Sequence, residues 1–328
     1  MHVGVQNLPV RALRQSARWL LRGAVTAAIV SYILVDVDRG DLVRAFTRVE
    51  PRRVAVALAI YLTGQVLSAY KWSLIGRAVG LERRFRTYAR FYFIGMFFNL
   101  FGPSTIGGDL ARGLYLGHGA RQALALNSVV FDRASGLALL MALGAVALLA
   151  FPEYHLPRPL AAAVVVGGLG LLLGWWMCPR LIRLLPAHNR LRRHVEEDLG
   201  AFWSDRPLLV RVAAVSLVFH LSQVLVQWQL TRAAGAAVPL SYCLLYHPLI
   251  SVMTALPVSV GGFGVREGGY LYFLTRIDID DSVAVTVGLL WFTVTLLGGM
   301  VGGAVFVASG ARLPLGVPRP APVGTTAS

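Results

Sequence analysis

The sequence predicts an all-α polytopic membrane protein with about six full spans and two re-entrant, broken helical hairpins in two inverted-topology halves. Three observations predict this class. Of the 328 residues, 56% are hydrophobic and only 14% are charged, whereas a soluble domain carries about a quarter charged residues. Several apolar runs are close to the roughly 20 residues that a helix needs to cross hydrocarbon. One motif of Pro, Gly and Arg interrupts an apolar run twice.

The predicted spans are the long apolar runs between polar or basic loops. Two shorter apolar runs end at the motif, and each is followed by a second short apolar piece, so we expect each pair to form a hairpin. The full spans are expected at Trp19–Val35, Val54–Ile75, Ala134–Phe151, Leu160–Cys178, Val210–Leu230 and Ser282–Ala308. The hairpins are expected to join Tyr88–Phe101 to Leu110–Leu116, and Tyr242–Leu256 to Gly268–Leu274.

These spans predict one transmembrane domain over residues 19–308, with halves at about 19–151 and 160–308. Residues 1–18 are basic and are expected in the cytoplasm. No small-residue cleavage site follows the first apolar run, so we interpret it as a retained span rather than a signal peptide. Residues 309–328 are rich in Pro and are expected to form a flexible tail.

The net charge of +15 comes from basic residues in short loops and not from a basic domain, which argues against nucleic-acid binding. Lys71–Arg90 and Arg180–Arg211 are the most basic segments, whereas "RIDIDDS" at residues 276–282 is acidic. The positive-inside rule then predicts a multi-pass protein of the cell membrane with both termini in the cytoplasm. With this orientation the two hairpins enter from opposite faces.

The repeated motif is P-x-[ST]-[IV]-G-G-x-x-x-R. It occurs in "GPSTIGGDLARG" at residues 102–113 and in "LPVSVGGFGVREGG" at residues 256–269, offset by 154 residues. Proline ends a helix, and paired glycines can take positive φ and bring backbone N–H groups close to a ligand. A following helix N-terminus and an arginine favour an anion. The predicted substrate-binding residues of these motifs are Gly107, Gly108, Asp109, Arg112, Gly261, Gly262, Arg266 and Glu267. The alternative for the glycines is close helix packing.

Charged residues in the motifs should face protein or water, because four of them facing lipid would cost roughly 10 kcal/mol. Asp109 and Arg112 are three residues apart on a helix and can pair. Glu267 is expected to pair away from its neighbour Arg266, across the pseudo-two-fold axis. A purely structural ion pair is the alternative for each acid.

Asp132 and Arg133 add a third charged pair, at the entrance of the predicted Ala134–Phe151 span. A site role and an interfacial anchor explain this pair equally well. Asn99 is a candidate buried amide, and Gln223, Gln227 and Gln229 could line a polar path. Two cysteines and seven histidines show no ligand spacing, so no metal and no cofactor are expected.

The stretches "FNLFGPSTIGGDLARGLYL", "SVVFDRASGLALL" and "LPVSVGGFGVREGGYLYFL" resemble the membrane domain of lysylphosphatidylglycerol synthases and its stand-alone flippase-like relatives. The resemblance covers about residues 20–308. It implies two inverted halves with broken hairpins, traffic of a lipid or a polyprenyl-phosphate-linked sugar, and a chain without the soluble synthase domain. Relatives commonly carry a basic residue near Trp291–Phe292, where this chain is apolar.

Two functions follow as expectations. The first is a flippase-like translocator, not an enzyme, whose partner is an anionic membrane lipid or a lipid-linked phosphate and which acts beside a separate lipid-modifying enzyme. The second is an intramembrane glycosyl- or phosphotransferase that uses Asp109, Asp132 and Glu267. Against the second, the longest loop, Arg180–Arg211, is short, so no sizeable aqueous domain is expected that could hold a water-soluble donor.

Overall fold

The fold was analysed in a computed structural model that describes residues 39–100, 106–117, 119–184, 186, 189, 200, 202–255 and 262–311. Throughout these ranges the chain forms helices and no strands, so the predicted all-α class is confirmed. The α-helices are α2 (Arg39–Thr47), α3 (Pro51–Ala78), α4 (Phe85–Asn99), α5 (Ile106–Leu116), α6 (Gln122–Ala150), α7 (Arg158–Ile182), α9 (Arg206–Ala233), α10 (Leu240–Ala255), α11 (Val265–Leu274) and α12 (Asp281–Ala308). Short 3₁₀ turns lie at Gly119–Arg121, Pro152–Tyr154 and Thr275–Ile277.

Five of the described helices, α3, α6, α7, α9 and α12, are long and apolar enough to cross a membrane. They correspond to five of the six predicted spans, while the predicted span Trp19–Val35 lies outside the described residues. The main difference is α6, which begins at Gln122 and not at the predicted Ala134. Charged residues inside α6 lower the local hydropathy, so the sequence pattern places its start too late.

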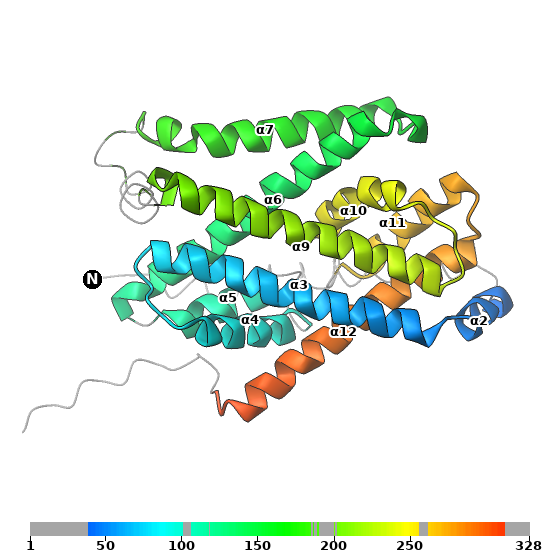
Figure 1. The fold of residues 1–328 in the computed structure, drawn as a ribbon, viewed down its shortest axis with the longest axis horizontal. Helices are drawn as coiled ribbons and strands as arrows, with labels where there is room; N and C mark the ends of the chain where they lie inside the picture. Colours follow the sequence, from blue (N-terminus) through cyan, green and yellow to red (C-terminus); the bar gives the residue numbers. More distant parts are fainter. Residues whose placement is uncertain are drawn as a thin grey trace, which may run out of the picture.

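The helices recur in the same order in the two halves. In residues, α3, α4, α5 and α6 have lengths of 28, 15, 11 and 29, and α9, α10, α11 and α12 have lengths of 28, 16, 10 and 28. Figure 1 shows α3 and α9 side by side and running in opposite directions, and they pack along each other. The α4–α5 pair and the α10–α11 pair lie towards opposite ends of the molecule (Figure 1).

Two long helices connect these pairs. Helix α6 packs against both α5 and α10, and α12 packs against both α11 and α4. The approach of α12 to α4 depends on small residues, since a Cβ atom on Gly302 would lie 2.0 Å from the carbonyl oxygen of Phe93. A stripe of glycines allows such backbone contact between membrane helices. The two pairs are therefore held in one helical body.

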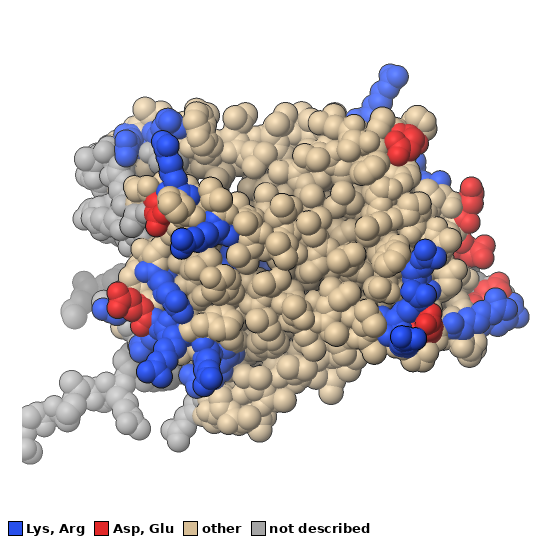
Figure 2. Space-filling model, in the orientation of Figure 1, with Lys and Arg blue, Asp and Glu red and all other residues tan. Residues whose placement is uncertain are grey.

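Charged side chains gather at the two ends of the molecule and leave a broad apolar belt between them (Figure 2). We call one end the basic end. It contains the C-terminus of α3 and the N-terminus of α4 and carries arginines, among them Arg77, Arg83, Arg84 and Arg86. The other end, the mixed end, carries more of the acidic residues, among them Glu153, Asp278, Asp280 and Asp281. An apolar belt between two charged rims is the pattern of a membrane protein.

Candidate functional site

The first motif enters helix α5 directly. Gly107 and Gly108 lie in the first turn of α5, so the predicted positive φ at these two residues is wrong. Gly108 instead packs tightly on α4, because a Cβ atom there would lie 2.0 Å from the carbonyl oxygen of Gly95. The backbone N–H of Gly108 donates to Oδ1 of Asn99 at 2.8 Å. Asn99 is thus a structural amide that joins the two arms of the hairpin.

Asp132 lies well inside α6 and not at the entrance of a span. It is the eleventh of the 29 residues of α6, and it is 3% exposed. The interfacial anchor considered for Asp132 is therefore wrong. A carboxylate at this depth needs partners, because an isolated buried charge is very costly.

Two cations pair with Asp132. Lys71 Nζ of α3 lies 3.0 Å from Asp132 Oδ1, and Arg112 Nη2 of α5 lies 2.9 Å from Asp132 Oδ2. Lys71 also donates to the backbone carbonyl of Asp132 at 2.8 Å. The three side chains are only 6%, 2% and 4% exposed in the order Lys71, Arg112 and Asp132. This arrangement joins three helices through one carboxylate.

Lys71 is a member of this cluster that the sequence pattern did not identify. It is the only lysine of the chain, and the pattern assigned it to the basic loop Lys71–Arg90. In the structure it lies in α3, seven residues before the end of that helix, and a Cβ atom on Gly136 would be 3.1 Å from its ammonium. Its position within an apolar run was the sequence signal that could have indicated a buried lysine.

Aromatic rings enclose the guanidinium of Arg112. Its Cζ lies 4.9 Å from the ring centroid of Trp72 and 5.2 Å from that of Tyr92. Among the described residues its Nε and Nη1 have no hydrogen-bond partner, so the ring faces supply their surroundings. Trp72 Nε1 donates to Ser128 Oγ at 3.1 Å, which orients the indole. Arg112 is therefore fixed beneath the surface of the site.

Asp109 and Arg133 form the accessible side of the same network. Arg133 donates through Nε and Nη2 to the carboxylate of Asp109 at 2.8 Å and 2.9 Å, a bidentate pair. The predicted Asp109–Arg112 pair is confirmed at 3.1 Å. The side chains of Asp109 and Arg133 are 18% and 46% exposed. We call Lys71, Asp109, Arg112, Asp132 and Arg133 the charge network; it holds three cations and two carboxylates.

The second motif has a different local structure. Gly262 and Gly264 have φ angles of 77° and 83°, so the positive φ expected at Gly262 is confirmed. The N–H of Gly264 donates to Oε2 of Glu267 at 2.6 Å. Glu267 therefore caps its own helix α11. Among the described residues it forms no ion pair, so the pairing expected across the pseudo-two-fold axis is not observed there. Gly261 lies outside the described residues, as do Pro103, Thr105, Pro257 and Ser259.

A row of buried polar side chains lies along α9. Gln223 and Gln227 are 5% and 1% exposed, and Gln227 Nε2 lies 2.6 Å from Nδ1 of His247 on α10. His220, also on α9, lies 3.0 Å from the carbonyl oxygen of Gly136, beside Lys71. The two histidines were missed by the sequence pattern because their partners are distant in the sequence.

Comparison with known proteins agrees with this architecture. Residues 19–303 match the family model described as the lysylphosphatidylglycerol synthase TM region. The chain is also similar to a UPF0104 membrane protein of Methanothermobacter thermautotrophicus, with 22% identity over 287 residues that cover 78% of this chain and 85% of the relative. The family match at residues 19–303 spans both hairpins and every residue of the charge network. The chain therefore belongs to the lysylphosphatidylglycerol synthase transmembrane family.

Proposed function

We propose that this membrane protein is a flippase-like translocator for an anionic lipid, either a phospholipid or a polyprenyl-phosphate-linked molecule. In this proposal the head group lies between the two motif-bearing hairpins. The observation that carries it is the exposure of Arg133. It is the twelfth residue of a 29-residue apolar helix, and 46% of its side chain is exposed.

An arginine at this depth costs about 2.5–3.5 kcal/mol if it faces lipid tails. A hydrated crevice or an anionic head group removes that cost. The charge network supports the anion, because its three cations and two carboxylates leave one positive charge uncompensated. Arg133 is the accessible cation, while Lys71 and Arg112 lie behind it and orient the carboxylates.

Arg266 is the proposed second contact. It lies at the start of α11 and is partly buried, and its Nη2 would be 3.3 Å from a Cβ atom on Gly262. Arg266 belongs to the second motif, as Asp109 and Arg112 belong to the first, so in this proposal the head group is held between the two halves.

The helical arrangement supports an alternating-access cycle. The helices recur in the same order in the two halves, α3 and α9 run in opposite directions, and the two hairpins lie towards opposite ends (Figure 1). Inverted repeats with broken helices at the centre are the pattern of many transporters. In our proposal the hairpins are re-entrant, the protein lies in the cell membrane, and the basic end and both termini face the cytoplasm.

One observation favours the transferase alternative. Oε1 of Glu267 is buried and has no hydrogen-bond partner among the described residues, so it could accept a proton. The other two acids considered for catalysis, Asp109 and Asp132, are both held in ion pairs. We therefore place the transferase function second. It would be supported by a new covalent product when the protein is incubated with a lipid and a glycosyl or phosphoryl donor.

The transport proposal is tested in proteoliposomes that contain fluorescent phosphatidylglycerol in one leaflet. Arg133→Gln and Arg266→Gln should each slow exchange by about tenfold or more, because each loses a charge-assisted contact of about 1.5–3 kcal/mol. Arg158→Gln is the matched control, since Arg158 is exposed at the start of α7 on the mixed end. Exchange that is unchanged in both motif variants, or equally fast for phosphatidylcholine, would contradict the proposal.

A further inference from the structure

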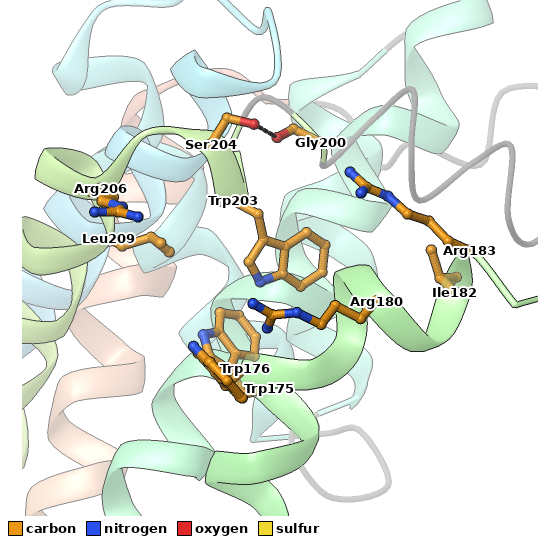
Figure 3. Close-up of a pocket in the computed structure, with 10 residues that line it drawn as sticks. All are labelled: Trp175, Trp176, Arg180, Ile182, Arg183, Gly200, Trp203, Ser204, Arg206 and Leu209. Atoms are coloured by element: carbon orange, nitrogen blue, oxygen red, sulfur yellow. Dashed lines mark hydrogen bonds between the residues drawn. The ribbon is translucent and has the colours of Figure 1, made fainter.

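A second basic site lies away from the charge network, at the basic end. A cavity of about 700 Å³ opens between the C-terminal part of α7 and the start of α9. Three tryptophans and three arginines dominate its described lining: Trp175, Trp176, Trp203, Arg180, Arg183 and Arg206 (Figure 3). Neither the hairpins nor the charge network contributes to this lining.

Aromatic rings pack against the tryptophans of this lining. Phe131 of α6 packs against Trp175 and Trp203, with ring centroids 4.6 Å and 4.9 Å apart. Trp175 and Trp203 also contact each other at 5.7 Å. The indole Nε1 of Trp203 is buried and has no hydrogen-bond partner among the described residues. The packed indole rings and the unpartnered N–H of Trp203 suit a ligand that carries hydrogen-bond acceptor oxygens.

The cavity is positively charged. The Cζ of Arg180 lies 4.3 Å from the ring centroid of Trp176, so the guanidinium is held over an indole face. Arg206 is exposed at the first position of α9. None of the described lining residues is acidic, and the nearby Asp205 is engaged, because its carboxylate accepts from the N–H of Leu208 at 2.9 Å.

Apolar surface adjoins the basic lining. Helix α7 packs mainly against α6, and α7 and α9 carry exposed apolar side chains close to this end. Leu173, Trp176 and Val210 are 56%, 62% and 68% exposed. Tryptophans at the boundary between an apolar belt and a basic rim are typical of the membrane interface. The cavity therefore lies where the head group of a membrane lipid would lie, beside a surface for its acyl chains.

We propose that this cavity binds the phosphate-bearing head group of an anionic phospholipid from the leaflet at the basic end. Arg180 and Arg206 would contact the phosphate as charge-assisted donors, since guanidinium groups suit phosphate oxygens. The Trp203 Nε1–H would donate to an ester or phosphate oxygen. This lipid stays at the periphery of the fold, so the inference does not depend on the transport proposal.

Native mass spectrometry of the full chain in neutral detergent tests this inference. Phosphatidylglycerol, phosphatidylcholine and inorganic phosphate are the probes. Wild-type protein should retain phosphatidylglycerol in preference to phosphatidylcholine. The double variant Arg180→Gln/Arg206→Gln should bind it on the order of tenfold or more weakly, because each arginine near a membrane surface contributes appreciably to anionic-lipid binding.

The matched control is Arg84→Gln/Arg86→Gln, which removes the same charge from two exposed residues at the basic end and should bind like wild type. Arg133→Gln should also keep this lipid, which separates the cavity from the proposed transport site. Unchanged binding in Arg180→Gln/Arg206→Gln would overturn the inference, and so would full competition by inorganic phosphate. If the double variant is not monodisperse, Arg206→Gln alone gives the same test with a smaller loss.

Discussion

Asp132→Ala is expected to lower the free energy of unfolding by about 3–5 kcal/mol, because it leaves the buried Lys71 without a carboxylate and the buried Arg112 paired with Asp109 alone. Lys71 and Arg112 both pair with Asp132 and are almost inaccessible to solvent. The expected result is a markedly lower melting temperature and a lower yield of folded protein in detergent. Asp41→Asn is the control, since Asp41 belongs to an exposed ion pair with Arg44, and exposed pairs contribute little.

A double-mutant cycle separates the ion pair from general damage. Lys71→Met removes the cation that Asp132→Ala leaves without a carboxylate, so Lys71→Met/Asp132→Ala should be more stable than Asp132→Ala alone. Strongly coupled side chains give such non-additive effects. If the two substitutions destabilise additively, Lys71 and Asp132 do not interact in the folded protein and the charge network is misassigned.

Gly108→Ala is expected to separate the arms of the first hairpin. The added Cβ would lie 2.0 Å from the carbonyl oxygen of Gly95 and 2.5 Å from Oδ1 of Asn99, so α4 or α5 must move. Overpacking of this kind costs about 1–3 kcal/mol, and loss of the Gly108–Asn99 hydrogen bond adds about 1 kcal/mol. The measurement is the melting temperature in detergent.

Gly170→Ala is the matched control in α7. A Cβ atom on Gly170 meets no atom within 4 Å, so this variant should be as stable as wild type or slightly more stable, because alanine favours helix. Equal melting temperatures for Gly108→Ala and Gly170→Ala would mean that the two arms do not approach as closely as the structure indicates. Gly108→Ala should also slow lipid exchange, since Asp109 follows directly and holds Arg133.

Local patterns predicted the elements that depend on neighbouring residues. Apolar runs located five of the described spans, and the motif located the breaks after Asn99 and before Val265. The three-residue spacing of Asp109 and Arg112 predicted their ion pair. The predicted helix bounds differed from the observed ones where charged residues interrupt an apolar run, as at the start of α6.

The partners across helices could not be predicted in this way. Lys71 and Asp132 are 61 residues apart, and Arg133 meets Asp109 across 24 residues. The sequence pattern assigned Lys71 to a basic loop, and Asp132 and Arg133 fitted an interfacial anchor as well as a site. Only the packing of α3, α5 and α6 shows that these charges pair with one another.

By itself, the sequence determined the membrane class, the order of the helices and the two interrupted segments. Composition and hydrophobic runs are local properties, and a bilayer accepts few other structures. The tertiary structure alone decided that Gly108 is a packing residue, that Glu267 caps its own helix, and that Arg133 is exposed while Arg112 is buried. These outcomes depend on which helix faces meet, and burial of a charge is tolerated only where a distant partner compensates it.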